Sequence, residues 1–378
     1  MTDSLAAGVR PRLGIDYTAA VGHAPGVGRY ARELARALVR LPDADTRPLV
    51  LVEVGRGPTP MEGAPLGLDD APQSARVSRR RLRLPRRVIA RMPGAGALVS
   101  RGCGLFHRVT PQSPPIGRTP FTLAVAEFPA AGTAASHALS AAAGTAAGLF
   151  VFSADALERL VRDHGAPRDR VHQLPVGTEH WERALESPVA PRATRDILVL
   201  GAIRHARAPL DVLRGFEALR ARDAHARLLL VGRPGDAAEA FRRALGASSV
   251  REHVRWIEEP DEARMPECVG GAAVLLHLAD DEATPVTPLE ATRMGLPVVA
   301  SPLPAFREAL GDAGRWVDRD DPAAVARALG EALAAADDSA TRSAMRERAL
   351  PYTWRASAEA HARAWDSILA GHQDAPGA

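Results

Sequence analysis

Two glutamates with seven residues between them, Glu282 and Glu290, have the types and spacing that could serve a ligand site. They lie in DEATPVTPLEATRMGLPVVAS, after the apolar run Ala273–Leu276 and before the apolar run Val298–Ala300. This order predicts that Glu282 is in the loop at the carboxyl end of a strand and that Glu290 is in the first turn of the next helix. Ligands of open parallel sheets bind at this edge, so both carboxylates are expected to open towards a ligand.

A second interpretation of Glu290 is purely structural. The residues Thr287, Pro288, Leu289 and Glu290 form a complete capping box, in which Thr287 is the N-cap and Glu290 reaches back to the N–H of the cap. Proline at the first helical position fits the same start. The helix is then expected to end at Gly295 in a left-handed conformation.

A glycine-rich segment from Gly14 to Arg29, GIDYTAAVGHAPGVGR, is another candidate ligand site. Gly26 and Gly28 precede a helical pattern, and a glycine-rich turn entering a helix offers backbone N–H groups to a phosphate. With Glu53 as the acid for a ribose, the segment also fits a nicotinamide enzyme, although about ten residues separate the glycines from their strand. A flexible loop without a ligand is the third interpretation.

The segment Arg76–Arg91, RVSRRRLRLPRRVIAR, holds eight arginines in sixteen positions with apolar residues between them. Its first interpretation is a solvated basic surface. The second is an interfacial patch that touches anionic lipid or a lipid-linked acceptor at the inner face of a membrane. Nucleic acid is not expected as a partner, because aromatic residues are only 4% of the chain and no stacking platform is visible.

The elements that must position these residues follow an alternating order. Short apolar runs of strand length and helical patterns succeed one another along the chain, which predicts parallel sheets covered by helices. The expected strands are Leu13–Ile15, Leu49–Val54, Phe121–Val125, Leu149–Phe152, Ile197–Leu200, Arg227–Val231, Val254–Ile257, Ala273–Leu276 and Val298–Ala300, and the clearest helices are Tyr30–Leu41, Ala154–Asp163, Leu210–Ala221 and Pro322–Ala335.

The length of 378 residues, with 46% hydrophobic and 25% charged residues, is typical of a globular chain of two domains. The segment Glu186–Arg195 has two prolines and no periodicity, so we expect the domain boundary there. We therefore predict an α/β protein with two facing Rossmann-like domains and a cleft between them. Residues 1–190 have 24 arginines and 17 acidic residues, whereas residues 191–378 have 24 and 28, so the two halves carry opposite net charges.

A cytoplasmic location is expected. The first twenty residues lack the apolar core of a signal peptide, and Phe128–Ala154 is too weakly apolar for a membrane span. Cys103 and Cys268 are far apart without a partner motif, so neither a disulfide framework nor a zinc site is expected.

The order of the segments resembles a family 4 glycosyltransferase of the GT-B fold over nearly the whole chain. The resemblance rests on the segments GIDYTAAVGHAPGVGRYARELARAL, FVFSADALERLVRDHGAPRDRVHQLPVGTE, ILVLGAIRHARAPLDVLRGFEAL, VRWIEEPDEARMPECVGGAAVLLHLADDEATPVTPLEATRMGLPVVAS and YTWRASAEAHARAW. It implies an acceptor domain at residues 1–188, a nucleotide-sugar domain at 193–350 and a helix at 351–378 that crosses back to the first domain.

The resemblance also implies the reaction. A hexose would pass from a nucleotide diphosphate to a hydroxyl of a glycan, lipid-linked or small-molecule acceptor, with retention of configuration and without a metal or other cofactor. Glu290 would bind the donor ribose, Glu282 would lie beside the transferred sugar, and Arg207 would stand where the family usually has lysine to hold the diphosphate. The further donor-binding positions implied are Arg204, Gly201, Thr284, Val286 and Gly28.

Two departures from the family pattern affect the expected mechanism. The loop after Glu282 is Ala283, Thr284, Pro285 instead of glycine, aromatic, glycine, and proline removes one N–H donor. The strand FTLAVAEF ends in Ala126 and Glu127 where the family has His-Asp. Either Glu127 or another group takes over that work, or the chain is a catalytically inactive helper or binding subunit.

The acidic segment Asp318–Asp321 resembles a metal-binding acid pair of another glycosyltransferase fold. Because proline follows Asp321, we favour Asp321 as the N-cap of the next helix.

Overall fold

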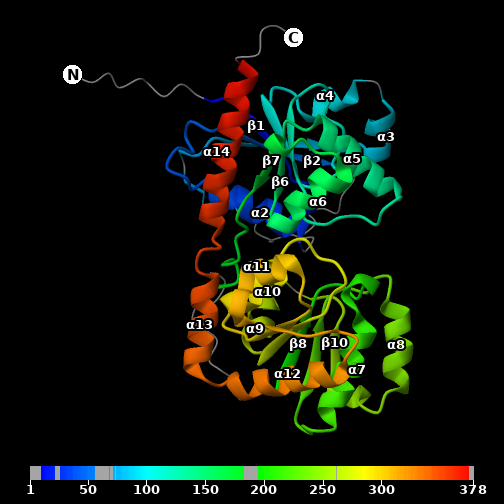
Figure 1. Cartoon of the computed structure of the whole chain (residues 1–378). Helices are drawn as coiled ribbons and strands as arrows, with labels where there is room; N and C mark the ends of the chain where they lie inside the picture. Colours follow the sequence, from blue (N-terminus) through cyan, green and yellow to red (C-terminus); the bar gives the residue numbers. More distant parts are fainter. Residues whose placement is uncertain are drawn as a thin grey trace, which may run out of the picture. The chain divides into compact units, whose positions relative to one another are not determined.

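The computed structural model of the chain (Figure 1) describes residues 10–21, 26–55, 68, 71–72, 74–92, 94–182, 195–260 and 262–373. The chain divides into two compact units, the first formed by Met1–Gly177 with Trp354–Ala378 and the second by Thr178–Thr353. The segment Glu186–Arg195, where we expect the boundary, lies outside the described residues except for Arg195. The chain passes between the units at Gly177 and again at Thr353, so the C-terminal residues belong to the first unit.

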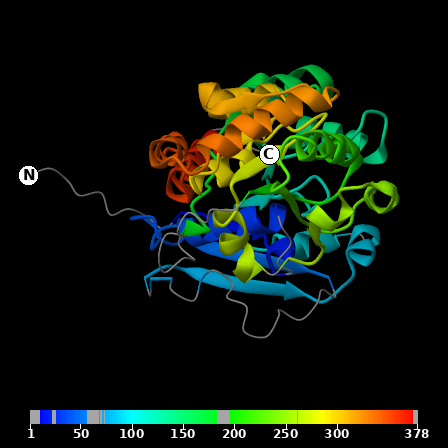
Figure 2. The same cartoon turned by 90° about the horizontal axis from the view of Figure 1, so that it is seen from below.

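The first unit contains a seven-stranded parallel sheet in the order β3-β2-β1-β4-β5-β6-β7. Its strands are β1 (Leu13–Asp16), β2 (Leu49–Val54), β3 (Val77–Leu82), β4 (Leu105–Arg108), β5 (Phe121–Ala124), β6 (Gly148–Val151) and β7 (Val171–Gln173). The four strands predicted here are confirmed, and β3, β4 and β7 are additional. Figure 2 shows β3 at the outer edge of the sheet, which is why an arginine-rich strand is tolerated there.

The helices of the first unit are α1 (Thr18–Val21), α2 (Val27–Leu38), α3 (Arg86–Arg91), α4 (Ala95–Val99), α5 (Ala134–Thr145), α6 (Ala154–His164) and α14 (Trp354–Gln373). Local sequence defines α6 at both ends. The Ser153 hydroxyl accepts the N–H of Ala156, and Gly165 has a φ of 65° at the C-terminal end. Helix α14, near the end of the sequence, packs against α2, near the beginning of the sequence.

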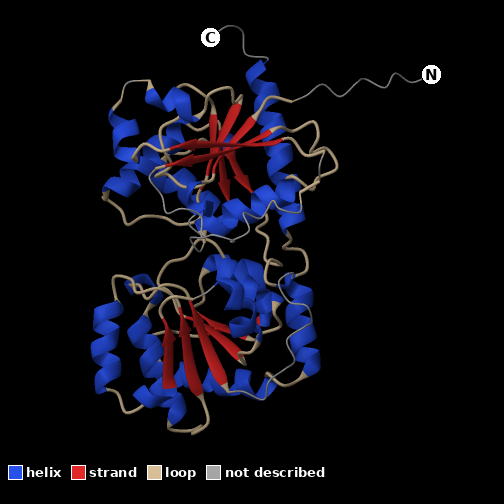
Figure 3. Ribbon diagram, turned by 180° about the vertical axis from the view of Figure 1, so that it is seen from behind, coloured by secondary structure: helices blue, strands red, loops and turns tan. Residues whose placement is uncertain are grey.

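The second unit contains a six-stranded parallel sheet in the order β10-β9-β8-β11-β12-β13, flanked by helices (Figure 3). The strands are β8 (Asp196–Leu200), β9 (Arg227–Val231), β10 (Val254–Ile257), β11 (Val274–His277), β12 (Val298–Ala300) and β13 (Gly314–Trp316), of which only β13 was not predicted. The α-helices are α7 (Pro209–Arg220), α8 (Ala238–Ala247), α9 (Met265–Gly270), α10 (Val286–Arg293), α11 (Pro304–Leu310), α12 (Pro322–Ala335) and α13 (Ser339–Ala349).

The predicted capping box at Thr287 is wrong. Helix α10 begins at Val286, its N-cap position is Pro285, and no side chain caps the helix. The N–H of Leu289 bonds to the carbonyl of Pro285, so Thr287 already lies inside the first turn. The expected end of the helix is confirmed, because Gly295 follows it with a φ of 81°.

The expected N-cap at Asp321 is also confirmed. Its carboxylate accepts the N–H of Ala324 at 2.9 Å, at the start of α12. The neighbouring Arg319 lies 2.7 Å from Asp280 and 3.2 Å from Asp211. The segment Asp318–Asp321 therefore serves helix capping and ion pairing in the second unit.

A relay of hydrogen bonds joins four elements in the interior of the first unit. Trp365 Nε1 donates to Thr122 Oγ1 at 3.0 Å, and that hydroxyl lies 2.9 Å from His107 Nδ1. Tyr30 Oη lies 2.9 Å from His107 Nε2 and 2.8 Å from His361 Nε2. Nδ1 of His361 lies 2.7 Å from a backbone carbonyl of α14.

The two ends of this relay fix the direction of every hydrogen bond in it. An indole nitrogen only donates and a carbonyl only accepts, so each group between them donates onward from Trp365 towards His361. For neutral histidines, this direction places the proton on Nε2 of His107 and on Nδ1 of His361. Burial lowers the pKa of His361 to about 4 and, with the nearby His361, lowers the pKa of His107 well below its ordinary value.

We expect the free energy of unfolding to fall as pH decreases from about 6.5 to 5. In this range the two histidines bind protons in the unfolded chain but stay neutral in the folded chain, where their pKa values are lowered. Each buried histidine contributes up to about 1.4 kcal/mol to the free energy of unfolding per pH unit. Replacing His361→Gln removes one such group and should flatten the slope. The measurement is urea unfolding at several pH values. His137→Gln, at an exposed position of α5, is the matched control, and equal slopes in the His361→Gln and control variants would contradict the assignment.

Candidate functional site

The carboxylate of Glu282 is held between two nitrogen groups in the second unit. Oε1 lies 3.0 Å from Arg207 Nη2, and Oε2 lies 2.7 Å from His277 Nε2. The side chain of Glu282 is 13% exposed, that of Arg207 is 24% exposed and that of His277 is 2% exposed. The residues come from two segments of the chain, Arg207 from the turn after β8 and His277 and Glu282 from the end of β11 and the loop after it. Because β8 and β11 are neighbours in the sheet, their ends bring these segments together.

Arg207 is positioned by the turn after β8. Its Nη1 donates to the carbonyl of Leu200 at 2.9 Å. Gly201 has a φ of 123°, and a Cβ added there would collide with the guanidinium. Ala208, with a φ of 44°, turns the chain into α7, whose first residue is Pro209. A left-handed alanine costs roughly 1 kcal/mol, so the turn is held in place by its surroundings.

His277 is a further residue of the candidate site, and the sequence patterns described above do not indicate it. It is the last residue of β11, and its ring packs edge-on against Phe306 of α11 with 5.3 Å between ring centroids. Its backbone carbonyl accepts the N–H of Ser301, next to β12. A polar ring that ends an apolar strand directly before a candidate acid is the signal that could have identified it.

Opposing effects set the charge of Glu282. Burial alone would raise the pKa of this carboxyl, but the Arg207 charge and the His277 charge and hydrogen bond, with a contribution from Arg204, bring the pKa below its ordinary value. Glu282 is therefore an anion at neutral pH. The site presents a carboxylate beside a guanidinium, which is an arrangement suited to a polar, anionic ligand.

Glu290 has a separate partner. Its side chain is 2% exposed, and its Oε1 lies 3.2 Å from Nε2 of His180 in the segment that opens the second unit. Arg293, one turn further along α10, lies 2.8 Å from Glu182 of the same segment. The two glutamates that the sequence analysis paired are thus engaged by different parts of the unit.

The remaining predicted donor positions surround the Arg207 turn. Arg204 is exposed at the start of the short helix that holds Arg207, Thr284 is buried in the loop after Glu282, and Val286 is the first residue of α10. A small cavity opens at the carboxyl ends of β8 and β11, lined among others by Gly201, Ala202, Ile203, Arg207, His277 and Leu278. The cavity lies at the sheet edge where a ligand was expected.

Two predicted positions lie in the first unit. Glu127 is exposed just after β5, and Gly28 is buried in the first turn of α2. Of the glycine segment before α2, residues 22–25 lie outside the described residues. Glu53, the acid of the nicotinamide interpretation, is buried at the end of β2 and forms ion pairs with Arg79 and Arg81 of the neighbouring strand.

Among the residues that the structure describes, no group of three or more His, Cys, Asp and Glu side chains is arranged to hold a metal ion. In the same part of the chain, no helix is long and apolar enough to cross a membrane.

Comparison with known families finds a match within the second unit. Residues 194–335 match a family described as "Glycosyl transferases group 1". Glycogen synthase of Bordetella parapertussis is 31% identical over 207 residues, and phosphatidyl-myo-inositol mannosyltransferase of Mycolicibacterium smegmatis is 33% identical over 185 residues. These alignments cover 50% and 48% of this chain, and 40% and 44% of the relatives, so the chain spans less than half of the proteins it matches.

Solved structures extend the fold similarity to both units. Sucrose-phosphate synthase from Thermosynechococcus elongatus superimposes with a TM-score of 0.67 over 96% of this chain and 100% of that one, at 17% identity. Anabaena HepE in complex with UDP and glucose gives a TM-score of 0.68 over 96% and 100%, at 13% identity. The predicted fold class is confirmed at the level of two Rossmann-like parallel sheets of GT-B type.

We expect Gly201→Ala to lower the free energy of unfolding by about 1–3 kcal/mol, because it places a side chain at positive φ and against Arg207. The measurement is urea unfolding at neutral pH. Gly330→Ala in α12 is the control, since a Cβ there meets nothing and a helical alanine stabilises by up to about 1 kcal/mol. A Gly201→Ala protein as stable as wild type would show that Arg207 is not held in this way.

Proposed function

We propose that this protein transfers a sugar from a nucleoside diphosphate sugar to an acceptor hydroxyl, because residues 194–335 match the family described as "Glycosyl transferases group 1". The observation that carries the proposal is the contact between Arg207 and Glu282 beside a cavity at the carboxyl ends of β8 and β11. This contact lies inside the matched domain. It supplies a cation for a diphosphate and a carboxylate for the hydroxyls of a sugar.

In the proposed reaction Arg207 binds the diphosphate and stabilises the negative charge that grows on it as the sugar departs. A guanidinium has five N–H donors, of which one is given to the Leu200 carbonyl and one to Glu282. The other donors remain for phosphate oxygens. Because Gly201 and Leu200 fix the guanidinium before the ligand arrives, little reorganisation is needed as charge develops.

Glu282 is proposed to accept hydrogen bonds from the transferred sugar. Arg207 and His277 keep this residue ionised and fix both oxygens of its carboxylate. His277 is proposed as a positioning residue for Glu282. Glu290 is proposed to meet the ribose of the donor, and Arg204, Thr284, Val286 and Gly28 to complete the donor site.

The stereochemistry and the acceptor are further parts of the proposal. The acceptor hydroxyl attacks from the side of the leaving group, the departing phosphate takes its proton, and configuration is retained without a metal. Glu127, exposed after β5 in the first unit, replaces the missing His-Asp pair. A UDP sugar is the donor to test first, since HepE was solved with UDP and glucose. The acceptor is a glycan, a lipid-linked molecule or a small molecule, reached from the cytoplasmic side, with peripheral membrane contact through Arg76–Arg91.

The test is binding of UDP and of a panel of nucleoside diphosphate sugars, measured by calorimetry and by the shift in melting temperature. Arg207→Ala should weaken UDP binding about 10–100-fold, the value of one lost charge-assisted hydrogen bond of about 1.5–3 kcal/mol. The matched control is Arg251→Ala, which removes an arginine of the same unit whose side chain is 63% exposed. This variant should bind UDP as wild type does.

Three results would overturn parts of the proposal. Binding of NAD without binding of any sugar nucleotide would remove the transferase assignment. Equal affinity in the Arg207→Ala and wild-type proteins would remove Arg207 from the diphosphate site. Donor binding without hydrolysis or transfer to any acceptor tested would limit the protein to a binding role.

A further inference from the structure

Exposed large apolar side chains gather in one short segment of the first unit. Among the described residues six such side chains are exposed, and four of them are Leu84, Val88, Met92 and Leu98, with exposures of 40%, 40%, 47% and 47%. Single exposed apolar residues are ordinary on protein surfaces, but a concentration of them within fifteen positions is not. The other two, Leu210 and Leu350, lie in the second unit.

The segment has a buried side and an exposed side. Ile89 of α3 is 2% exposed and packs in a core cluster with residues such as Val52, Val99 and Ile116. This anchor fixes α3 on the sheet. Val88 lies in α3, Leu84 lies two residues before this helix, and Met92 directly follows it. All three side chains are exposed, in contrast to the buried Ile89.

An exposed arginine precedes each of these three apolar residues. The pairs are Arg83 with Leu84, Arg87 with Val88, and Arg91 with Met92, and the three arginines are exposed. Within the described residues none of the three arginines forms an ion pair, in contrast to Arg79 and Arg81 of β3, which pair with Glu53. The sequence holds no Asp or Glu from residue 71 to residue 126 that could neutralise them.

The combination of charge and exposed apolar surface selects one class of partner. Nucleic acid would satisfy the arginines, but it would leave the aliphatic side chains without a role, and the sequence has no Phe, Trp or Tyr from residue 31 to residue 105 for base stacking. An anionic bilayer satisfies both, since phosphate groups meet the arginines and the acyl boundary takes the apolar side chains. Arginine stems also pack well along such a boundary.

We propose that the basic-apolar face, formed by Arg83, Leu84, Arg87, Val88, Arg91, Met92 and Leu98, binds the surface of an anionic phospholipid membrane. The inference deepens the membrane contact of the proposed function by naming its residues and its lipid chemistry. It does not require that the protein be catalytically active. The buried Ile89 anchors α3, which carries the middle part of this face, on the core of the first unit.

The test is co-sedimentation of the full chain with vesicles of phosphatidylcholine, with and without phosphatidylglycerol. Wild type should bind the anionic vesicles and not the neutral ones, and binding should weaken as salt is added. The variants are the apolar triple Leu84→Ser, Val88→Ser, Met92→Ser and the arginine triple Arg83→Gln, Arg87→Gln, Arg91→Gln. Each should lower the partition coefficient at least about tenfold.

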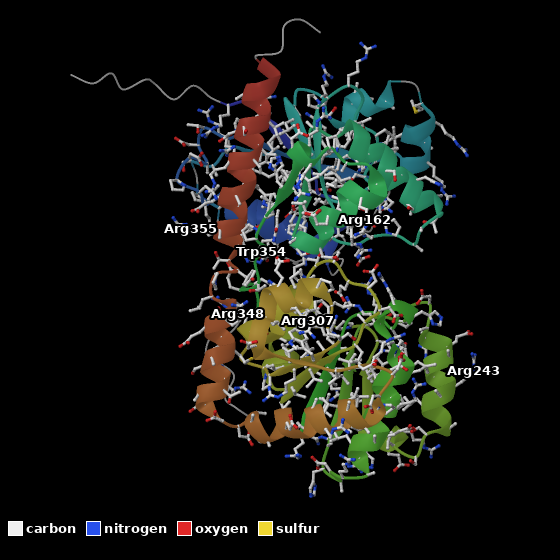
Figure 4. All side chains as sticks on the ribbon, in the orientation of Figure 1. Arg162, Arg243, Arg307, Arg348, Trp354 and Arg355 are labelled. Carbon is white, nitrogen blue, oxygen red and sulfur yellow. The ribbon has the colours of Figure 1, made fainter. Side chains whose placement is uncertain are left out.

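Two control variants match these changes elsewhere on the chain. Leu210→Ser with Leu350→Ser removes exposed apolar side chains of the second unit. Arg162→Gln, Arg243→Gln and Arg355→Gln remove three charges that point outward from α6, α8 and α14 (Figure 4), where their side chains are 67%, 74% and 76% exposed. Both controls should bind anionic vesicles within about twofold of wild type, because patch position rather than net charge decides binding.

Two outcomes would overturn the inference. An equal loss in the control arginine triple would show a general effect of net charge. A duplex or single-stranded oligonucleotide that binds wild type and the apolar triple equally well, with no vesicle binding, would assign the face to nucleic acid. Melting curves check that each variant is folded, and Met92→Ser alone, expected to weaken binding about threefold, replaces a triple that fails to fold.

UDP binding to the same variants separates this inference from the proposed function. Both triples should bind UDP as wild type does. If the wild-type protein binds UDP but not anionic vesicles, only the membrane inference is wrong. If it binds anionic vesicles but neither UDP nor a sugar nucleotide, only the transferase proposal is wrong.

Discussion

The carboxylate of Glu282 is largely removed from water, and its negative charge is stable there because Arg207 and His277 reach its two oxygens. Much of the second unit is arranged to deliver these groups. Parallel strands β8 and β11 are neighbours, so their carboxyl ends meet, and the turn after β8 brings a guanidinium to the loop after β11. Gly201 leaves space for that guanidinium, and Phe306 packs against the histidine. The proposed sugar transfer would use this charged group to bind the donor.

Sequence patterns predicted most of the strands and indicated several residues of the candidate site. Central strands such as β2 and β9 are covered on both faces, so their sequences are nearly continuous apolar runs, which can be recognised without the structure. Strand β3 was missed because an edge strand needs only backbone pairing with one neighbour, which arginines permit. Glu282 was predicted from its position after an apolar run, and Arg207 from resemblance. His277 was not, because a histidine in an apolar strand reveals its partner only once the following loop is folded.

Long-range contacts account for the other surprises. A capping box is a local pattern, and in α10 it does not form. The helix begins earlier, at Val286, directly after Pro285. The partner of Glu290 is His180, which comes from far upstream in the chain. In the first unit, Tyr30, His107 and His361 complete each other's hydrogen bonds although they come from the beginning, middle and end of the sequence. No window of local sequence contains such pairs.

The division of the chain, in which Thr178–Thr353 interrupts the first unit, has a consequence for biosynthesis. The hydrogen-bond relay of the first unit begins at Trp365 and ends within α14, so the last helix supplies both termini of the relay. While the chain is being made, the second unit is complete before this helix leaves the ribosome. Of the two units, the one that starts first is therefore the one that finishes last, and Tyr30 and His107 stay without their α14 partners until that helix has been translated.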